Sequence, residues 1–283
     1  MKCYKGSILS VDANDGVYRY LVVEDGKIVY IGNELPEQYS NAETIDIGNK
    51  AIAPAFGTES SLTTDIRHNM SNTKIIILDF DGTLGNTTNV IIRTMHATIK
   101  EMGLPERTDA ECATMIGPRL IEIPPLLFPG LDVDCERYAE VYRKNFKIYN
   151  TEGAVEVYPN VLETLKELKE RGYILTVASS RSNSTLTAYI KALGIDETIS
   201  FIIGAEDVKT GKPDPEAVLK TLEKFDLKPE EAIVVGDTMY DVQMGLNAGT
   251  RTCAVTYGNG TRETLSEATW IIDDFALLLD LGL

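Results

Sequence analysis

Short apolar runs alternate with amphipathic stretches over most of the chain beyond residue 73. Five of the runs are continuous and apolar, as expected for parallel strands that are buried on both faces. They cover residues 74–78, 174–178, 201–203, 232–235 and 252–255. Strands alternating with helices predict an α/β fold with a doubly wound parallel sheet, which we assign to residues 73–86 and 156–283.

The stretch 161–169 shows the helical pattern between these strands. Four apolar residues recur at the spacing of one helix face, with Glu and Lys opposite. They are Val161, Leu162, Leu165 and Leu168. Gly172 follows where a helix of this length would end, and glycine is the residue that most readily caps a helix C-terminus.

Residues 87–155 interrupt the alternation. Residues 89–103 align Ile91, Met95 and Ile99 on one face, and residues 135–149 form a second helix candidate. No convincing strand pattern occurs between them. This stretch is therefore predicted to be a helical insertion after the first strand.

The first 56 residues have a different texture. Runs of β-branched and aromatic residues predict strands over 8–11, 18–23 and 27–31, with further pieces at 44–47 and 51–53. The sequence Glu24-Asp25-Gly26 predicts a tight hairpin between two of them. Residues 57–72 are polar and without period, which is typical of a linker.

The charge balance restricts the partners. Lys and Arg total 27 against 43 Asp and Glu, giving a net charge of −16. Such a surface repels polyanions, so we expect no nucleic acid partner. A phosphorylated substrate would also be repelled unless the site supplies local cations: a metal, a lysine or helix N-termini.

Other compositional features indicate a cytoplasmic protein without a membrane span. No apolar run approaches the roughly 20 residues that a spanning helix needs. The first residues lack the apolar stretch of a signal peptide. Four scattered cysteines, none in a CxxC pair, are predicted to be reduced and structural.

Candidate chemistry begins at the end of the first predicted strand. The apolar run leads directly into Asp79-Phe80-Asp81-Gly82-Thr83. The carboxyl end of a parallel strand is where α/β proteins place ligand sites, and residues two apart in an extended chain point the same way. Two carboxylates so close are unfavourable unless a cation accompanies them. Taken alone, the motif also fits a plain turn.

Three later motifs favour a site over a turn. Asp237 and Asp241 follow another buried strand, and Ser179 and Ser180 follow a third. Lys212 lies just before a predicted helix. Because all these strands would end at one edge of the sheet, the motifs together predict a site for phosphoryl transfer.

At these residues the chain resembles the haloacid dehalogenase superfamily, and in particular its phosphoglycolate-phosphatase-like members with a helical cap. Four motifs occur in the same order, and the resemblance covers residues 73–283. It implies that Asp79 is the nucleophile that forms an aspartyl-phosphate. It implies that Asp81 protonates the leaving oxygen and then activates water. Dehalogenating members lack this second acid, so Asp81 favours a phosphatase or a sugar-phosphate mutase.

The resemblance assigns further roles around the phosphoryl group. Ser179 would hydrogen-bond a phosphoryl oxygen, and Lys212 would neutralise the group. Mg²⁺ would be held by Asp79, Asp237, Asp241 and the backbone carbonyl of Asp81, an all-oxygen set that suits this ion. The remaining predicted substrate contacts are Gly82, Thr83 and Ser180.

Specificity is expected to come from the cap. The loop Gly117-Pro118-Arg119 is the natural one to reach the site, and Arg119 could bind a substrate carboxylate or a second phosphate. A solvated arginine is the alternative. Asn183 could face the site or could simply cap a helix.

Several signals have plainer interpretations. Gly258-Asn259-Gly260 lacks the third glycine of a dinucleotide loop and is predicted to be a turn. His68 and His96 are predicted surface residues, and Trp270 is predicted to belong to the core.

The N-terminal segment has its own resemblance. Residues 22–32 and 44–56 resemble the opening strands of metal-dependent amidohydrolases, but no His-x-His metal pair follows. No amidohydrolase residue or activity is carried over. A fragment with open strand edges could self-associate.

The sequence therefore predicts a Mg²⁺-dependent phosphatase acting on a small phosphorylated metabolite, such as a phosphoglycolate-like compound or a sugar phosphate. Two alternatives stay open. One is a phosphomutase of the β-phosphoglucomutase type with the same core. The other is a catalytically silent fusion that serves as a binding module.

Overall fold

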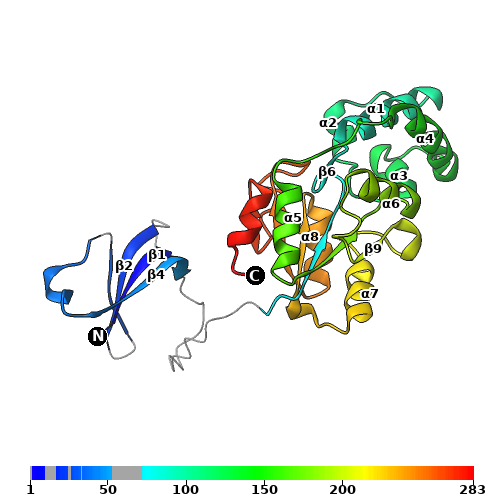
Figure 1. Ribbon diagram of the computed structural model, residues 1–283. Helices are drawn as coiled ribbons and strands as arrows, with labels where there is room; N and C mark the ends of the chain where they lie inside the picture. The colour runs from blue at the N-terminus through cyan, green and yellow to red at the C-terminus, as the bar shows by residue number, and fades with distance from the viewer. Residues whose placement is uncertain (1, 10–16, 25–26, 33, 53–71) are drawn as a thin grey trace. The chain divides into compact units, whose positions relative to one another are not determined.

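The structure is a computed structural model that describes residues 2–9, 17–24, 27–32, 34–52 and 72–283. The chain divides into two compact units, Met1–Asn69 and Met70–Leu283 (Figure 1). Most of the predicted linker, residues 25 and 26 of the predicted hairpin turn, and His68 lie outside the described residues.

The first unit is a four-stranded sheet. Its strands are β1 (Lys2–Leu9), β2 (Val17–Glu24), β3 (Lys27–Gly32) and β4 (Glu43–Ile52), with the 3₁₀ turn η1 (Glu37–Tyr39) before β4. The order is β3-β2-β1-β4, and only the β1–β4 pair is parallel. Self-association through its edges stays a prediction.

Strand boundaries in this unit differ from the predicted ones. β1 begins at Lys2 rather than residue 8, and the two pieces predicted at 44–47 and 51–53 are one strand, β4. Polar residues interrupt the alternation of apolar and polar positions at the start of β1 and in the middle of β4, so the pattern did not predict these parts of the strands. Pairing of β1 with a neighbour on each side makes the strand, and Cys3 and Val22 fill a small core.

The second unit contains a six-stranded parallel sheet of order β12-β11-β10-β5-β8-β9. The strands are β5 (Ile75–Leu78), β8 (Ile174–Ala178), β9 (Phe201–Ile203), β10 (Ala232–Gly236), β11 (Arg251–Val255) and β12 (Trp270–Ile272). Five were predicted. The sixth is only three residues long and is defined by its pairing with β11. Trp270, predicted to be core, is half-buried and packs at its edge.

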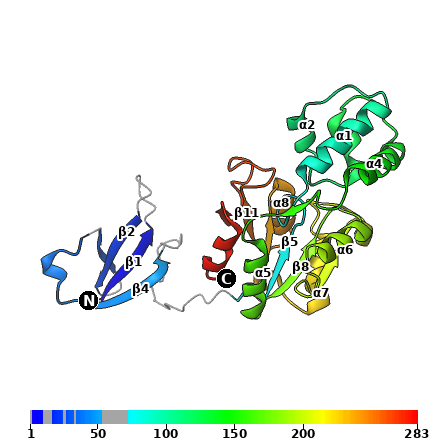
Figure 2. The ribbon, with the colours of Figure 1, turned by 45° about the horizontal axis from the view of Figure 1, so that its top comes forward.

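Helices cover both faces of this sheet (Figure 2). Ile76 and Leu78 face a cluster that includes α5 (Val161–Glu170), α6 (Asn183–Ala192) and the 3₁₀ segment η5 (Phe275–Asp280). Ile75 and Ile77 face α7 (Glu216–Phe225) and α8 (Met239–Asn247). The turns η3 (Ala205–Asp207) and η4 (Pro229–Glu231) precede α7 and β10. The predicted doubly wound α/β fold is confirmed.

Helix α5 contains one error of the sequence pattern. Leu165 and Leu168 are buried as predicted, but Leu162 is 42% exposed and lies outside the buried face. Val161, one position earlier, is buried, because successive helical residues are about 100° apart and only one of them faces the sheet. Gly172 has φ +92°, in the left-handed region expected of a helix C-terminal glycine.

The inserted cap is helical and lies at one end of the sheet in both views (Figures 1 and 2). It contains α1 (Thr88–Glu101), α2 (Asp109–Ala113), η2 (Leu120–Glu122), α3 (Ile123–Leu127) and α4 (Cys135–Tyr149). Its own core joins α1, α2, α3 and α4. The chain enters and leaves through β6 (Gly85–Asn86) and β7 (Glu156–Val157), which pair with each other. Among the residues placed here, no helix is long and apolar enough to cross a membrane.

The two leucines of α5 provide a matched test of this packing. Leu165→Ala should lower the free energy of unfolding by about 2–5 kcal/mol, because it leaves a cavity under the sheet. Leu162→Ala should change it by less than about 0.5 kcal/mol. Denaturant unfolding followed by the fluorescence of Trp270, the single tryptophan, reports on this unit. Equal losses for the two variants would contradict the assigned faces.

Candidate active site

The polar residues predicted from the motifs gather at the carboxyl edge of the parallel sheet. Asp79 directly follows β5 and Asp237 directly follows β10, the strand paired with β5. Ser179 directly follows β8, on the other side of β5. From β5 the chain adds β8 and β9 on one side and then β10, β11 and β12 on the other. The two aspartates therefore stand at the topological switch point between β5 and β10, where open α/β sheets bind ligands.

Three carboxylates and one ammonium form the centre of the site. Asp79, Asp237 and Asp241 are buried, and each offers an oxygen within 4.8 Å of those of the other two. The Nζ of Lys212 donates to Asp79 and, at 2.6 Å, to Asp241. With all three carboxylates ionised, the cluster would carry two negative charges more than Lys212 can neutralise.

The pKa values of these groups follow from burial and from their neighbours. Burial raises the pKa of Asp79 well above its usual range, and Lys212 opposes the rise. Burial, followed by the nearby Asp241 carboxylate, raises the pKa of Asp237 to about 7. The pKa of Lys212 is raised because the two carboxylates outweigh the effect of burial. The buried acids are thus short of positive charge.

Two residues of the first motif hold Asp237. A Cβ on Gly82, whose φ is +85°, would stand 2.1 Å from an Asp237 Oδ2 atom, so only glycine fits. The Thr83 hydroxyl donates to Asp237 Oδ1 at 3.3 Å. Both residues were predicted to contact the substrate, but neither lines the pocket described below. The structure gives them a place behind the acidic cluster.

Asn259 also holds Asp237, and sequence reasoning missed it. Its backbone N–H and its Nδ2 donate to Asp237 Oδ2 at 2.7 and 2.8 Å. The segment was predicted to be only a turn. Its position beyond the carboxyl end of β11, next to β10, was the one available signal. A Cβ on Gly258 would stand 2.4 Å from Asp237, which explains the glycine before it.

Asp81 is paired with Arg181, which sequence reasoning also missed. Arg181 Nε donates to one carboxylate oxygen at 3.1 Å and Nη2 donates to the other. The guanidinium is held over the rings of Phe146 and Tyr189, at 5.2 and 4.9 Å from their centroids. The pKa of Arg181 is raised, since Asp81 outweighs the effect of burial. The Asp81 carboxylate therefore lies outside the acidic cluster, and only its backbone could serve the predicted metal.

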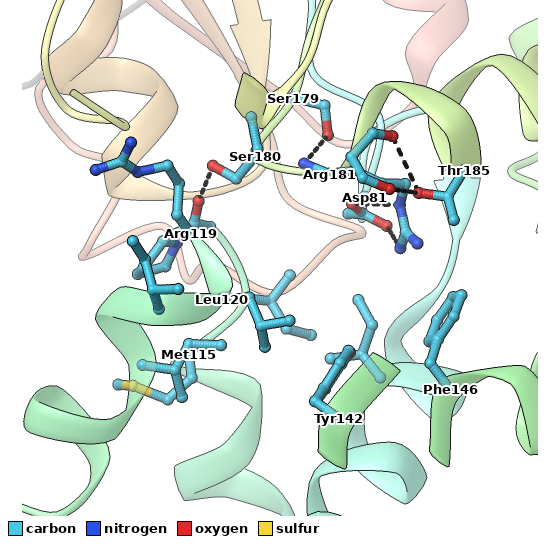
Figure 3. A pocket seen from close by; sticks show the side chains of 18 of the residues that line it. Asp81, Met115, Arg119, Leu120, Tyr142, Phe146, Ser179, Ser180, Arg181 and Thr185 are labelled. Atoms are coloured by element: carbon cyan, nitrogen blue, oxygen red, sulfur yellow. Dashed lines mark hydrogen bonds and ion pairs between the residues drawn. The ribbon is translucent and has the colours of Figure 1, made fainter. Parts of the chain in front are cut away.

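A pocket of about 470 Å³ lies between the core and the cap. Its core side carries Asp81, Ser179 and Ser180 (Figure 3). Asp79 lines the same pocket. Its cap side carries apolar residues, among them Met115, Leu120, Tyr142 and Phe146. The pocket thus joins the predicted nucleophile and acid to a space that the cap encloses.

The predicted cap loop reaches the core. The Ser180 hydroxyl donates to the carbonyl of Gly117 in the cap, and Ser180 also lines the pocket, so its contact with substrate stays a prediction. Arg119 lines the pocket, but its Nε and Nη2 pair with Glu122 Oε1 at 2.8 and 2.6 Å. Its Nη1 donates to the carbonyl of Lys209 at 2.9 Å. Arg119 therefore joins cap and core and is not free to meet an anion without losing these bonds.

The remaining predicted residues have structural surroundings. Asn183 begins α6, lies against Gly204 and does not line the pocket. Its backbone N–H bonds Glu206 at 2.8 Å, and its Oδ1 is buried without a hydrogen-bond partner. His96 pairs with Asp109 at 2.6 Å near the surface of the cap.

Comparison with known proteins agrees with this geometry. The model of haloacid dehalogenase-like hydrolases matches residues 76–255. A pyrophosphatase, PpaX, of Bacillus velezensis is 33% identical, over 72% of this chain and 94% of its own. A phosphoglycolate phosphatase of Haemophilus influenzae is 31% identical, over 74% of this chain and 97% of its own.

Solved structures show the same fold. A haloacid dehalogenase-like hydrolase from Bacteroides fragilis aligns with TM-score 0.69 and 27% identity, over 73% of this chain and 99% of that one. A predicted phosphoglycolate phosphatase from Haemophilus somnus aligns with TM-score 0.65 and 26% identity, over 76% of this chain and 100% of that one.

The fold and the site define a class of α/β protein. Its members have a parallel sheet, a buried aspartate–lysine cluster at the carboxyl edge of that sheet, and an inserted cap. The chain belongs to the haloacid dehalogenase-like hydrolase family. The prediction of a phosphatase of this superfamily is confirmed.

The contact between Arg181 and Asp81 can be tested by substitution. Arg181→Ala should lower kcat/KM for an alkyl phosphate at least about tenfold, because Asp81 loses the group that orients it and the ester oxygen needs a proton to leave. Arg181→Lys should recover only part, since lysine cannot bind both carboxylate oxygens in one plane. Arg93→Ala, which removes a cation stacked on Tyr149 in the cap, is the control. Wild-type kcat/KM in Arg181→Ala would refute the positioning role.

Proposed function

We propose that the protein is a Mg²⁺-dependent phosphatase that hydrolyses small phosphate monoesters through an aspartyl-phosphate on Asp79. One observation carries this proposal. Asp79 both belongs to the buried acidic cluster and lines the cap-covered pocket. It is therefore the carboxylate that can meet a metal ion and a substrate phosphate at once.

The acidic cluster fits Mg²⁺ by the chemistry of its donors. Asp79, Asp237 and Asp241 offer oxygen ligands only, which is the set that Mg²⁺ prefers. A divalent cation would balance the two negative charges that Lys212 leaves uncompensated. When bound, the ion would supply the positive charge that lets an anionic nucleophile approach an anionic phosphate.

In the first step, an Asp79 oxygen attacks phosphorus while the bond between phosphorus and the ester oxygen breaks. Lys212 donates to Asp79, and Ser179 lines the same pocket as Asp79, so both would bind phosphoryl oxygens. Asp81 would give its proton to the leaving oxygen. Arg181 donates one N–H to each oxygen of Asp81, which leaves a second lone pair on each oxygen for the proton that is transferred.

In the second step, Asp81 would take a proton from a water molecule, and the oxygen of that water would attack the phosphorus of the aspartyl-phosphate. The bond to Asp79 breaks, phosphate leaves, and Asp81 is protonated again. The cap contacts made by Gly117 and Arg119 would keep other water away from the site. Phosphoglycolate and pyrophosphate appear in the names of two relatives, so they are the reference substrates for this protein.

Asp79→Asn should lower the release of phosphate from p-nitrophenyl phosphate by at least about a thousandfold, because an amide is a poor nucleophile. Wild-type activity should require Mg²⁺ and disappear with EDTA. Asp196→Asn, at an exposed position, is the matched control and should behave as wild type. Metal-independent turnover, or turnover that survives in Asp79→Asn, would reject the proposed mechanism.

Stabilisation by Mg²⁺ should depend on pH. The folded-state pKa of Asp237, about 7, lies above the unfolded value near ~3.9, so the metal-free folded state binds more protons and loses stability as pH rises through this window. Mg²⁺ needs the ionised carboxylate and competes with the proton. The rise in Tm caused by Mg²⁺ should thus be larger at pH 8 than at pH 5.5.

Thermal unfolding at constant ionic strength measures this difference. Asp237→Asn should remove most of the gain at pH 8, and Asp196→Asn should leave it unchanged. An equal gain at both pH values would indicate that the ion binds elsewhere on the acidic surface.

A further inference from the structure

We propose that the pocket accepts a phosphate monoester whose leaving group has an apolar body of several carbons, rather than the small ionic group of phosphoglycolate or pyrophosphate. This inference rests on the proposed function and specifies its substrate class. It is carried by the cap side of the pocket, by the pairing of its basic residues and by its volume.

The cap presents an apolar wall to the catalytic residues. Met115, Leu120, Tyr142 and Phe146 lie across the pocket from Asp81, Ser179 and Ser180 (Figure 3). Ile91, Ile116 and Ile123 extend this wall. Beyond the phosphate, a leaving group would therefore meet hydrocarbon and aromatic rings.

The basic residues that would hold a small anion are either paired with carboxylates or exposed to solvent at the opening of the pocket. Among the described residues, four basic side chains line the pocket: Arg119, Arg143, Lys147 and Arg181. Arg119 is bound to Glu122, and Arg181 is bound to Asp81. Arg143 and Lys147 are exposed, so they lie where the pocket opens to solvent and would gain little from an ion pair.

The pocket keeps a large volume although the cap is already in contact with the core. The Gly117 carbonyl accepts from Ser180, and Arg119 bonds Lys209 across the same boundary. The pocket still holds about 470 Å³, within the range of sites that enclose ligands of drug size. A glycolate group would leave most of that space, and the apolar wall, unused.

An apolar leaving group would gain affinity from this wall. Each methylene that leaves water for an apolar surface should tighten binding about three- to fourfold. The same change leaves the acidity of an alkyl alcohol almost constant, so a series of n-alkyl chains separates binding from leaving-group chemistry.

The test uses the full-length protein with Mg²⁺. The Kd of n-alkyl phosphonates, from ethyl to octyl, is measured by calorimetry, and kcat/KM is measured for the matching alkyl phosphates, phosphoglycolate and pyrophosphate. We expect Kd to fall about threefold per methylene up to hexyl, and kcat/KM for hexyl phosphate to exceed that for both ionic substrates at least tenfold.

A pair of cap variants assigns the effect to the wall. Leu120→Asn should flatten the series to less than twofold per methylene. Leu126→Asn makes the same change in the cap at a side chain that is 49% exposed and outside the pocket, and should keep the wild-type slope. Equal slopes in the two variants would overturn the role of the wall.

Two further outcomes separate this inference from the proposed function. Hydrolysis with a Kd independent of chain length, or with a tenfold preference for phosphoglycolate or pyrophosphate, overturns the inference and keeps the phosphatase. A Kd that falls with chain length while no phosphate ester is hydrolysed supports the pocket's selectivity and rejects the mechanism.

Discussion

The site depends on the ion pairs that the ammonium of Lys212 makes with Asp79 and Asp241. Buried charges are costly unless they are paired, and this cluster is paired only in part. The negative charge that Lys212 leaves uncompensated is the charge that the proposed metal ion would balance. The sheet meets this constraint by ending β5 and β10 side by side, so that Asp79 and Asp237 share one place.

Core and cap divide the work of the site. The core supplies the charged and hydroxyl groups, and the cap supplies apolar surface and contacts that close the pocket. Arg181 connects the two, because it binds Asp81 in the core and lies over Phe146 of cap helix α4. A movement of the cap would therefore change the position of the Asp81 carboxylate. The change would pass through the contact of Arg181 with the Phe146 ring and through its ion pair with Asp81, rather than through the backbone.

Much of the core was predictable, because buried parallel strands are continuous apolar runs. β8 and β9 have the predicted bounds, and β5, β10 and β11 differ by a residue at one end. β12 was missed, and it is defined by its pairing with β11 at the edge of the sheet. Leu162 was misplaced because neighbouring apolar residues at a helix start leave the buried direction ambiguous.

The doubly wound core, the helical insertion and the residues of the candidate site could be predicted from the sequence alone, because each follows from local periodicity or from motifs that end strands. Which side chains meet depends on the folded chain. Asn259 bonds Asp237, Arg181 bonds Asp81, and Arg119 bonds the carbonyl of Lys209. These contacts join segments through loop paths and side-chain reach, which have no period, so the chain's own pattern could not reveal them.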